Sequence, residues 1–184
     1  MSNETVLEVC NVFIKVFDHG ELVRTELGHN VWTNTGREYS CLLKSYNTDG
    51  NPYRTDRIRY VGLGNGTQIE SVSVSKLVSP ISYSQGGDFL KPINHNLTTF
   101  PDSGLRTAIR YTSRFGTTTF PGEGTTYISE CGLFTDGHAV SFTQGGRETS
   151  IAVADEQSPV AYHTFDPIPK TSGIELEITW ELRH

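Results

Sequence analysis

The chain has 184 residues, a formal net charge of −6 and 35% hydrophobic residues. A chain of this length fits one domain, residues 1–184, whose core is large enough to fold without a metal or a disulfide. Because the Lys and Arg residues are few and scattered, the composition argues against binding to a nucleic-acid backbone.

Three cysteines, Cys10, Cys41 and Cys131, are widely spaced and lie outside any metal-binding pattern. An odd, scattered set favours a reducing compartment, in which each thiol is a small buried apolar group. The first residues have neither the basic start nor the apolar core of a secretory signal, and no stretch approaches the ~20 apolar residues of a membrane helix. We therefore expect a soluble protein made in a cytoplasm, with no membrane partner.

The first 32 residues predict a β-hairpin. Residues 6–17 are rich in Val, Ile and Phe on both faces, which is typical of a strand covered on two sides by its own sandwich or by a neighbouring subunit. Residues 18–21 form a turn, and residues 21–32 return as the partner strand.

A short helix is predicted next. Thr35 and Glu38 match a capping box, in which a hydroxyl and a carboxylate satisfy free amides at the start of a helix. The helix is expected to stop near residues 47–50. The apolar residues that follow the cap have the i, i+3, i+4, i+7 spacing of one helix face: Tyr39, Leu42, Leu43 and Tyr46.

Residues 58–63 predict a strand that runs into a glycine-rich segment, 62–66. We interpret these glycines as a tight turn with positive φ, since the third glycine of a dinucleotide-binding loop is missing. Thr67 and Glu70 form a second capping-box pattern, so residues 68–76 are either a short helix or an extended segment. The polar stretch 81–103 is either ordered, with a weak strand at 89–93, or a flexible arm that orders on contact.

Residues 105–119 are β-branched and aromatic, and residues 125–134 and 139–144 flank an Asp-Gly turn at 135–138, which predicts a hairpin. A strand at 162–165 is followed by a break at 166–169. The last strand alternates clearly. Its core face is expected to carry Ile174, Leu176, Ile178, Trp180 and Leu182, and its solvated face Glu175, Glu177, Thr179, Glu181 and Arg183. The whole pattern predicts a mainly β protein, an antiparallel β-sandwich of jelly-roll-like type with one or two short helices.

The sequence presents no pattern typical of catalysis. It has no Gly-x-Ser-x-Gly elbow and no cysteine in an activating context, and the strand carboxylates are expected to be solvated rather than paired in a cleft. We therefore expect no enzyme activity, no catalytic residue, no cofactor and no metal. The histidines lack the close spacing of a zinc site: His19, His29, His95, His138, His163 and His184.

Five short motifs occur in a fixed order along nearly the whole chain. They are His29 and Asn30 with Asn34 and Gly36; Tyr60, Gly62, Gly64 and Gly66 with Leu77 downstream; Glu130, Gly132, Leu133 and Phe134 with Gly137; Phe165, Pro167, Ile168 and Lys170; and Ile178, Thr179, Trp180 and Glu181. This ordered set resembles a widespread group of tailed-bacteriophage structural proteins. The shared residues have the character of fold determinants, so the resemblance implies no functional residues.

The resemblance implies a virion protein that forms a homo-oligomer, a ring or a trimer, and packs against other virion proteins at the tail, collar or baseplate. A decoration protein that cements the phage capsid is the alternative, and copy number separates the two. A glycan- or receptor-binding sandwich is an alternative of another class, although Trp180 falls on the core face of its strand. The aromatic side chains that offer stacking surfaces for a sugar are Trp32, Tyr46, Tyr53 and Trp180.

Overall fold

The computed structural model describes residues 9–44, 58–82, 89–102, 107–119, 124–135, 139–144, 147–152 and 158–183. Side chains are described in the same ranges, except at 9–10, 41–44 and 139–152. The side chains of Cys10 and Cys41 and the turn at 136–138 therefore lie outside the described part of the chain.

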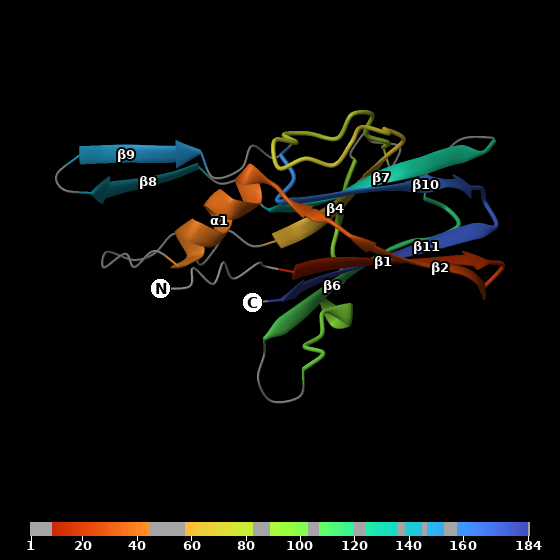
Figure 1. The fold of residues 1–184 in the computed structure, drawn as a ribbon. Coiled ribbons are helices and arrows are strands. Elements are labelled where there is room, and N and C mark those ends of the chain that lie inside the picture. Colours follow the sequence, from red (N-terminus) through yellow and green to blue (C-terminus); the bar gives the residue numbers. More distant parts are fainter. Residues whose placement is uncertain are drawn as a thin grey trace, which may run out of the picture.

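Two antiparallel sheets form two layers (Figure 1). The four-stranded sheet has the order β2-β1-β11-β6, and the five-stranded sheet has the order β3-β10-β7-β4-β5. The strands of the first sheet are β1 (Val9–Asp18), β2 (Glu21–His29), β6 (Ala108–Phe115) and β11 (Ile174–Arg183). Those of the second are β3 (Val31–Trp32), β4 (Ile58–Gly64), β5 (Leu90–Pro92), β7 (Thr126–Thr135) and β10 (Ala161–Lys170).

The remaining described elements lie outside the two sheets. They are the helix α1 (Asn34–Lys44), the 3-10 helix η2 (His95–Leu97) and a separate two-stranded ribbon, β8 (Ala139–Gln144) with β9 (Arg147–Ala152). Within the described residues, no helix has the length and apolar character needed to cross a membrane.

The main core lies between the two sheets and takes alternate residues from their facing strands. β1 and β11 supply one side of it, and β4, β7 and β10 supply the other. Alternation along each strand produces this layer, because successive side chains point to opposite faces of a sheet. Fully or almost fully buried members include Val12, Ile14, Leu176, Ile178, Trp180, Val61, Leu63, Ile128, Leu133 and Ile168. The predicted mainly β, antiparallel sandwich is confirmed, while its jelly-roll-like connectivity stays a prediction.

A second, smaller cluster covers the outer face of the five-stranded sheet. Val74 and Leu77, from the segment 65–82, pack there on Phe134 and Tyr162. Phe89 meets the ring of Phe134 edge-on, at 5.9 Å between centroids. This sheet is therefore buried on both faces, which explains the nearly continuous burial along β7.

The N-terminal hairpin is confirmed, and its turn has the expected geometry. His19 and Gly20 both have positive φ, 48° and 87°, as a two-residue turn of type I′ requires. The predicted partner strand 21–32 is wrong beyond His29, because the chain crosses there to the other sheet. β3 pairs with β10, and the Thr33 hydroxyl donates a 2.6 Å hydrogen bond to the carbonyl of Pro159.

The predicted helix is confirmed, but its cap lies two residues earlier than expected. The hydroxyl of Thr33 accepts a hydrogen bond from the amide of Gly36 at 3.1 Å, which makes Thr33 the N-cap in place of Thr35. Gly36 is needed because a Cβ there would collide with the carbonyl of Val160. The helix start is thus fixed by its contact with Val160, the residue immediately before β10.

Three further expectations are corrected. Of the two alternatives for residues 68–76, the helix is wrong: the segment is not helical and contains a turn that the amide of Val74 closes on the carbonyl of Ser71. β7 and β8 do not form a hairpin: β7 is a central strand with β4 and β10 on its two sides, so β8 pairs with β9. β10 continues through Pro167 and Pro169. Pro167 lies in the register shift between Thr164 and Ile168, Pro169 lies opposite Tyr127 of β7, and β3 pairs only with Ala161 and Tyr162 at the start of β10.

Candidate functional site

Glu130 is a fully buried carboxylate that binds the segment 65–80 onto the five-stranded sheet. Its Oε1 accepts hydrogen bonds from the amides of Gly66 (3.0 Å) and Ser79 (2.9 Å). Its Oε2 accepts from the amide of Val78 (3.1 Å) and from the hydroxyl of Tyr162 (2.8 Å). Four donors offset the cost of burying the charge, and both ends of the segment are held by one side chain.

The glycines of the predicted turn leave room for this carboxylate, because they have no Cβ. A Cβ on Gly64 would collide with the Glu130 carboxylate and lie 2.6 Å from the carbonyl of Ser79, and one on Gly66 would lie 2.6 Å from Oε1 of Glu130. Our interpretation of these glycines as positive-φ residues is wrong, since the only described glycines with positive φ are Gly20 and Gly124. They are needed for close approach of backbone to side chain.

The same feature gives a test at one position. Gly64→Ala is expected to lower the free energy of unfolding by about 1–3 kcal/mol, because the carboxylate must shift away from its donors. Gly116→Ala is the matched control, since no atom lies within 4 Å of a Cβ added at Gly116. Urea denaturation measures both, and equal effects of the two substitutions would show that Gly64 makes no such contact.

Glu70 and His163 form a second polar contact between the segment and the sheet. Oε1 of Glu70 lies 2.7 Å from Nδ1 of His163 and accepts the amide of Thr164 at 2.8 Å. Burial alone would raise the pKa of Glu70, but these hydrogen bonds and the nearby imidazole hold that pKa below its usual value. Glu70 thus binds a strand backbone instead of capping the helix that its sequence pattern suggested.

Two groups near these acids, His163 and Cys131, are buried. A Cβ on Gly28 would collide with Nε2 of His163, so that ring nitrogen lies directly against strand β2. Burial, together with the negative charges of Glu70 and Glu130, raises the pKa of the Cys131 thiol well above its usual value, which keeps the thiol protonated. Each group supports the packing of the segment and the strands around it.

The outer face of the four-stranded sheet carries a ladder of ion pairs, which we call the charge ladder. Glu177 accepts from Nζ of Lys15 at 2.9 Å and from Nε of Arg114 at 2.6 Å. Glu181 accepts from Nε of Arg110 at 2.6 Å and from Nε of Arg183 at 2.7 Å.

The expectation that these strand carboxylates are solvated is wrong. Glu177 is only 6% exposed and Glu181 only 2% exposed. β11 lies between β1 and β6, and the long basic side chains of both neighbours cover the acids.

The ladder predicts a loss of stability in acid. Burial alone would raise the pKa of Glu177, but hydrogen bonds from Lys15 and Arg114 outweigh it and lower that pKa, as Arg183 and Arg110 do for Glu181. A pKa lowered by folding adds stability above the unfolded value of about 4.3, and that stability is lost as the pH falls through the folded value. Urea denaturation at a series of pH values is therefore expected to show stability decreasing below about pH 4.

A double variant separates the ladder from the other acids. Lys15→Met with Arg114→Met is expected to cost about 1–3 kcal/mol at neutral pH, between the values of an exposed and a buried ion pair. The pH dependence should also become shallower, because the pKa of Glu177 is no longer lowered. Lys76→Met, at an exposed position, is the control; an unchanged pH profile in the double variant would contradict this account.

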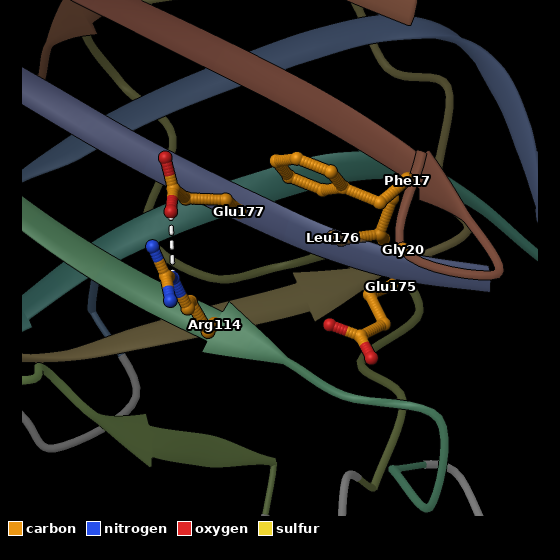
Figure 2. Close-up of a pocket in the computed structure, with 6 residues that line it drawn as sticks. All are labelled: Phe17, Gly20, Arg114, Glu175, Leu176 and Glu177. Carbon is orange, nitrogen blue, oxygen red and sulfur yellow. Dashed lines mark hydrogen bonds and ion pairs between the residues drawn. The ribbon is translucent and has the colours of Figure 1, made fainter. Parts of the chain in front are cut away.

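Two shallow depressions lie on this face. One, of about 200 Å³, is lined by Phe17, Gly20, Arg114, Glu175, Leu176 and Glu177. The other, of about 250 Å³, is lined by Phe13, Lys15, Arg110, Thr112, Glu177 and Thr179. Figure 2 shows the guanidinium of Arg114 pointing at the carboxylate of Glu177 in the first depression. Lys15 and Arg114 are paired here with Glu177, and Arg110 is paired with Glu181 and lies over the ring of Phe13.

The residues named from sequence are dispersed over the structure. His19, His29 and His95 are exposed, whereas His138 and His184 lie outside the described residues, and in the described part of the chain no three His, Cys, Asp or Glu side chains gather as a metal would need. Trp180 is fully buried and Trp32 packs against the core, so neither ring stands free for a sugar; Tyr46 and Tyr53 lie outside the described ranges.

Sequence reasoning did not find Glu130 and Glu70 as organising residues. One signal was present: Glu130 is the one charged residue inside an otherwise uncharged, largely buried strand, where it must have partners. Comparisons of this chain with protein-family models, with curated proteins and with solved structures found no match.

Proposed function

We propose that this chain is a structural component of a tailed-phage particle. It is made in the host cytoplasm and becomes part of the virion at the tail, collar or baseplate. Its work is to pack against copies of itself and against other virion proteins.

The observation that carries the proposal is the common role of the five ordered motifs. Each motif that resembles phage structural proteins contributes residues to a buried contact. The five motifs therefore belong to a single folded scaffold. The first supplies Gly36 against Val160, and the second and third supply Gly64 and Glu130. The last two supply the core residues Ile168, Ile178 and Trp180. The resemblance predicts that this chain and the phage proteins share a scaffold. Motif residues that hold the scaffold together therefore support the resemblance.

The surface supports a packing role as well. Large apolar side chains are exposed on β2, at Leu22, Val23 and Leu27, and on the segment 65–80, at Ile69 and Val78. Neighbouring exposed apolar residues mark surfaces that other proteins cover. On the segment they are held in place by the hydrogen bonds that Glu130 accepts from the amides of Gly66 and Val78, and by the one that Glu70 of the segment accepts from the amide of Thr164.

Quantitative mass spectrometry of particles purified from the phage that encodes this chain tests the proposal. We expect the chain at about 3–18 copies per particle for a tail, collar or baseplate part, as closed symmetry dictates. Hundreds of copies would instead favour the capsid-decoration alternative. Particles that lack the chain would refute both, and a glycan array would then test the sugar-binding alternative.

A further inference from the structure

Strand β2 is the long open edge of the two packed sheets. The other edge of its sheet, β6, is covered, because Asn94 and Thr99 hydrogen-bond to its backbone. In the five-stranded sheet the edges are β3, with two residues, and β5, with three residues that include Pro92. β2 has nine residues and contains no proline, and in the described part of the chain it pairs with β1 alone.

The sequence of β2 is complementary to itself when it is reversed. The strand reads ELVRTELGH, and its midpoint is Thr25. An antiparallel second copy centred there places Thr25 opposite Thr25, Arg24 opposite Glu26, Val23 opposite Leu27, and Glu21 opposite His29. Each charged side chain of one strand thus meets an opposite charge or an imidazole, and each large apolar one at 23 and 27 meets another.

We propose that two copies of this chain join through β2, antiparallel about a two-fold axis at Thr25. The pairing merges two four-stranded sheets into one continuous sheet and satisfies the open edge of both copies. This inference rests on the proposed function, because it names the surface through which a homo-oligomeric virion protein contacts its copies.

The charges on β2 select this register over its neighbours. Arg24 and Glu26 lie on one face of the strand, are half-buried and form an ion pair with each other, which leaves them placed to extend the pairing to a second copy. A shift of the two-fold axis by one residue, to Arg24 or to Glu26, places like charges opposite each other, which is unfavourable. The register shift between β1 and β2 occurs between the pairs Val16–Arg24 and Phe17–Leu22, which leaves Val23 without a partner on β1, while residues 24–29 pair regularly with β1.

The same pairing would also bury part of the exposed apolar surface of β2. Leu22, Val23 and Leu27 are 54%, 59% and 61% exposed. Leu22 and Leu27 pair with Phe17 and Phe13 of β1, so they lie on the outer face of the sheet. In the dimer, Val23 of one copy lies against Leu27 of the other, and the apolar surface of the two copies becomes continuous.

A reciprocal charge exchange tests the pairing in solution. Arg24→Glu leaves acids at both 24 and 26, and Glu26→Arg leaves bases at both, so like charges face each other in either homodimer. Sedimentation velocity over a concentration series should show wild-type dimer, and self-association weakened by at least about tenfold in each variant. Because the two variants are complementary, an equimolar mixture should form dimer again. Arg37→Glu, on the exposed side of α1, makes the same change of net charge and should leave the dimer intact.

A cross-link that keeps the native charges gives a second readout. Thr25→Cys places a thiol opposite its own copy only if the axis passes through residue 25, at a Cα separation that a disulfide spans. Mild oxidation should yield a disulfide dimer with Thr25→Cys and none above the wild-type level with Leu27→Cys, whose partner is Val23.

The outcomes separate this inference from the proposed function. A wild-type chain that stays monomeric, or a mixture of the two charge variants that does not dimerise, overturns the β2 pairing. An oligomer that forms but ignores the charge exchange also overturns it, while leaving a virion role in place. Absence of the chain from the particle refutes the virion role and leaves a β2 dimer seen in solution standing.

Discussion

Replacing Glu130 by Ala is expected to lower the free energy of unfolding by about 3–5 kcal/mol. The amides of Gly66, Val78 and Ser79 and the hydroxyl of Tyr162 would all lose their acceptor. Because these donors lie against the sheet, the segment 65–80 must either detach to reach water or stay with unpaired groups.

Glu130→Gln removes the negative charge of the side chain while it keeps the side chain's size and shape. The amide keeps one acceptor oxygen but turns an NH₂ group toward donors, so we expect a cost of about 2–3 kcal/mol. Glu38→Gln, on the exposed face of α1, is the control and should stay within about 0.5 kcal/mol of wild type. Guanidinium denaturation measures all three variants.

Hydrogen exchange gives a local readout of the same contact. In Glu130→Gln, the amides of Gly66, Val78 and Ser79 should exchange faster than in wild type, while those of β11 should follow only global stability. If the three amides kept their wild-type protection relative to β11, Glu130 would not be what holds the segment.

Trp180→Ala is expected to cost about 3–5 kcal/mol, because it empties the largest fully buried side chain of the core between the sheets. Neighbouring side chains such as Ile14 and Leu133 belong to the same cluster and have little room to collapse into the space. Thermal or urea denaturation followed by circular dichroism measures the loss.

Tyr127→Ala is the matched aromatic control. Tyr127 is exposed on β7, so its removal should cost less than about 1 kcal/mol. Equal losses in the two variants would mean that the interface between the sheets is not the main source of stability.

The periodicity of the last strand predicted its core residues well, because alternation depends on the strand alone. Ile178 and Trp180 are buried as expected. The burial of Glu177 and Glu181 on the other face depends on neighbours far away in sequence, Lys15 and Arg110. Alternation shows which side chains share a face, and it does not show what covers that face.

The failed hairpin at 135–138 has a similar cause. An Asp-Gly pair between two apolar runs is a local signal for a turn, whereas the partners of β7 are set by long-range packing. β7 is buried on both faces and has a strand on either side, so its hydrogen bonds were already taken. The local signal identified the ends of the strands but not their pairing.

The glycine-rich run shows what was missing for the candidate site. From sequence alone, Gly64 and Gly66 suggested turn conformations, because positive φ is the usual reason for glycine. Their true reason is a carboxylate more than 60 residues away in the chain, as the separation of 64 between Gly66 and Glu130 shows. The reason for the glycines becomes clear only when the glycine-rich run and the motif that contains Glu130 are considered together.

An electron cryomicroscopy map of the assembled phage particle tests the proposed function most directly. We predict density for this sandwich in a closed ring or trimer at the tail, collar or baseplate, with its exposed apolar surfaces covered by neighbouring chains. A map of the complete particle in which no density fits the chain would contradict the proposal.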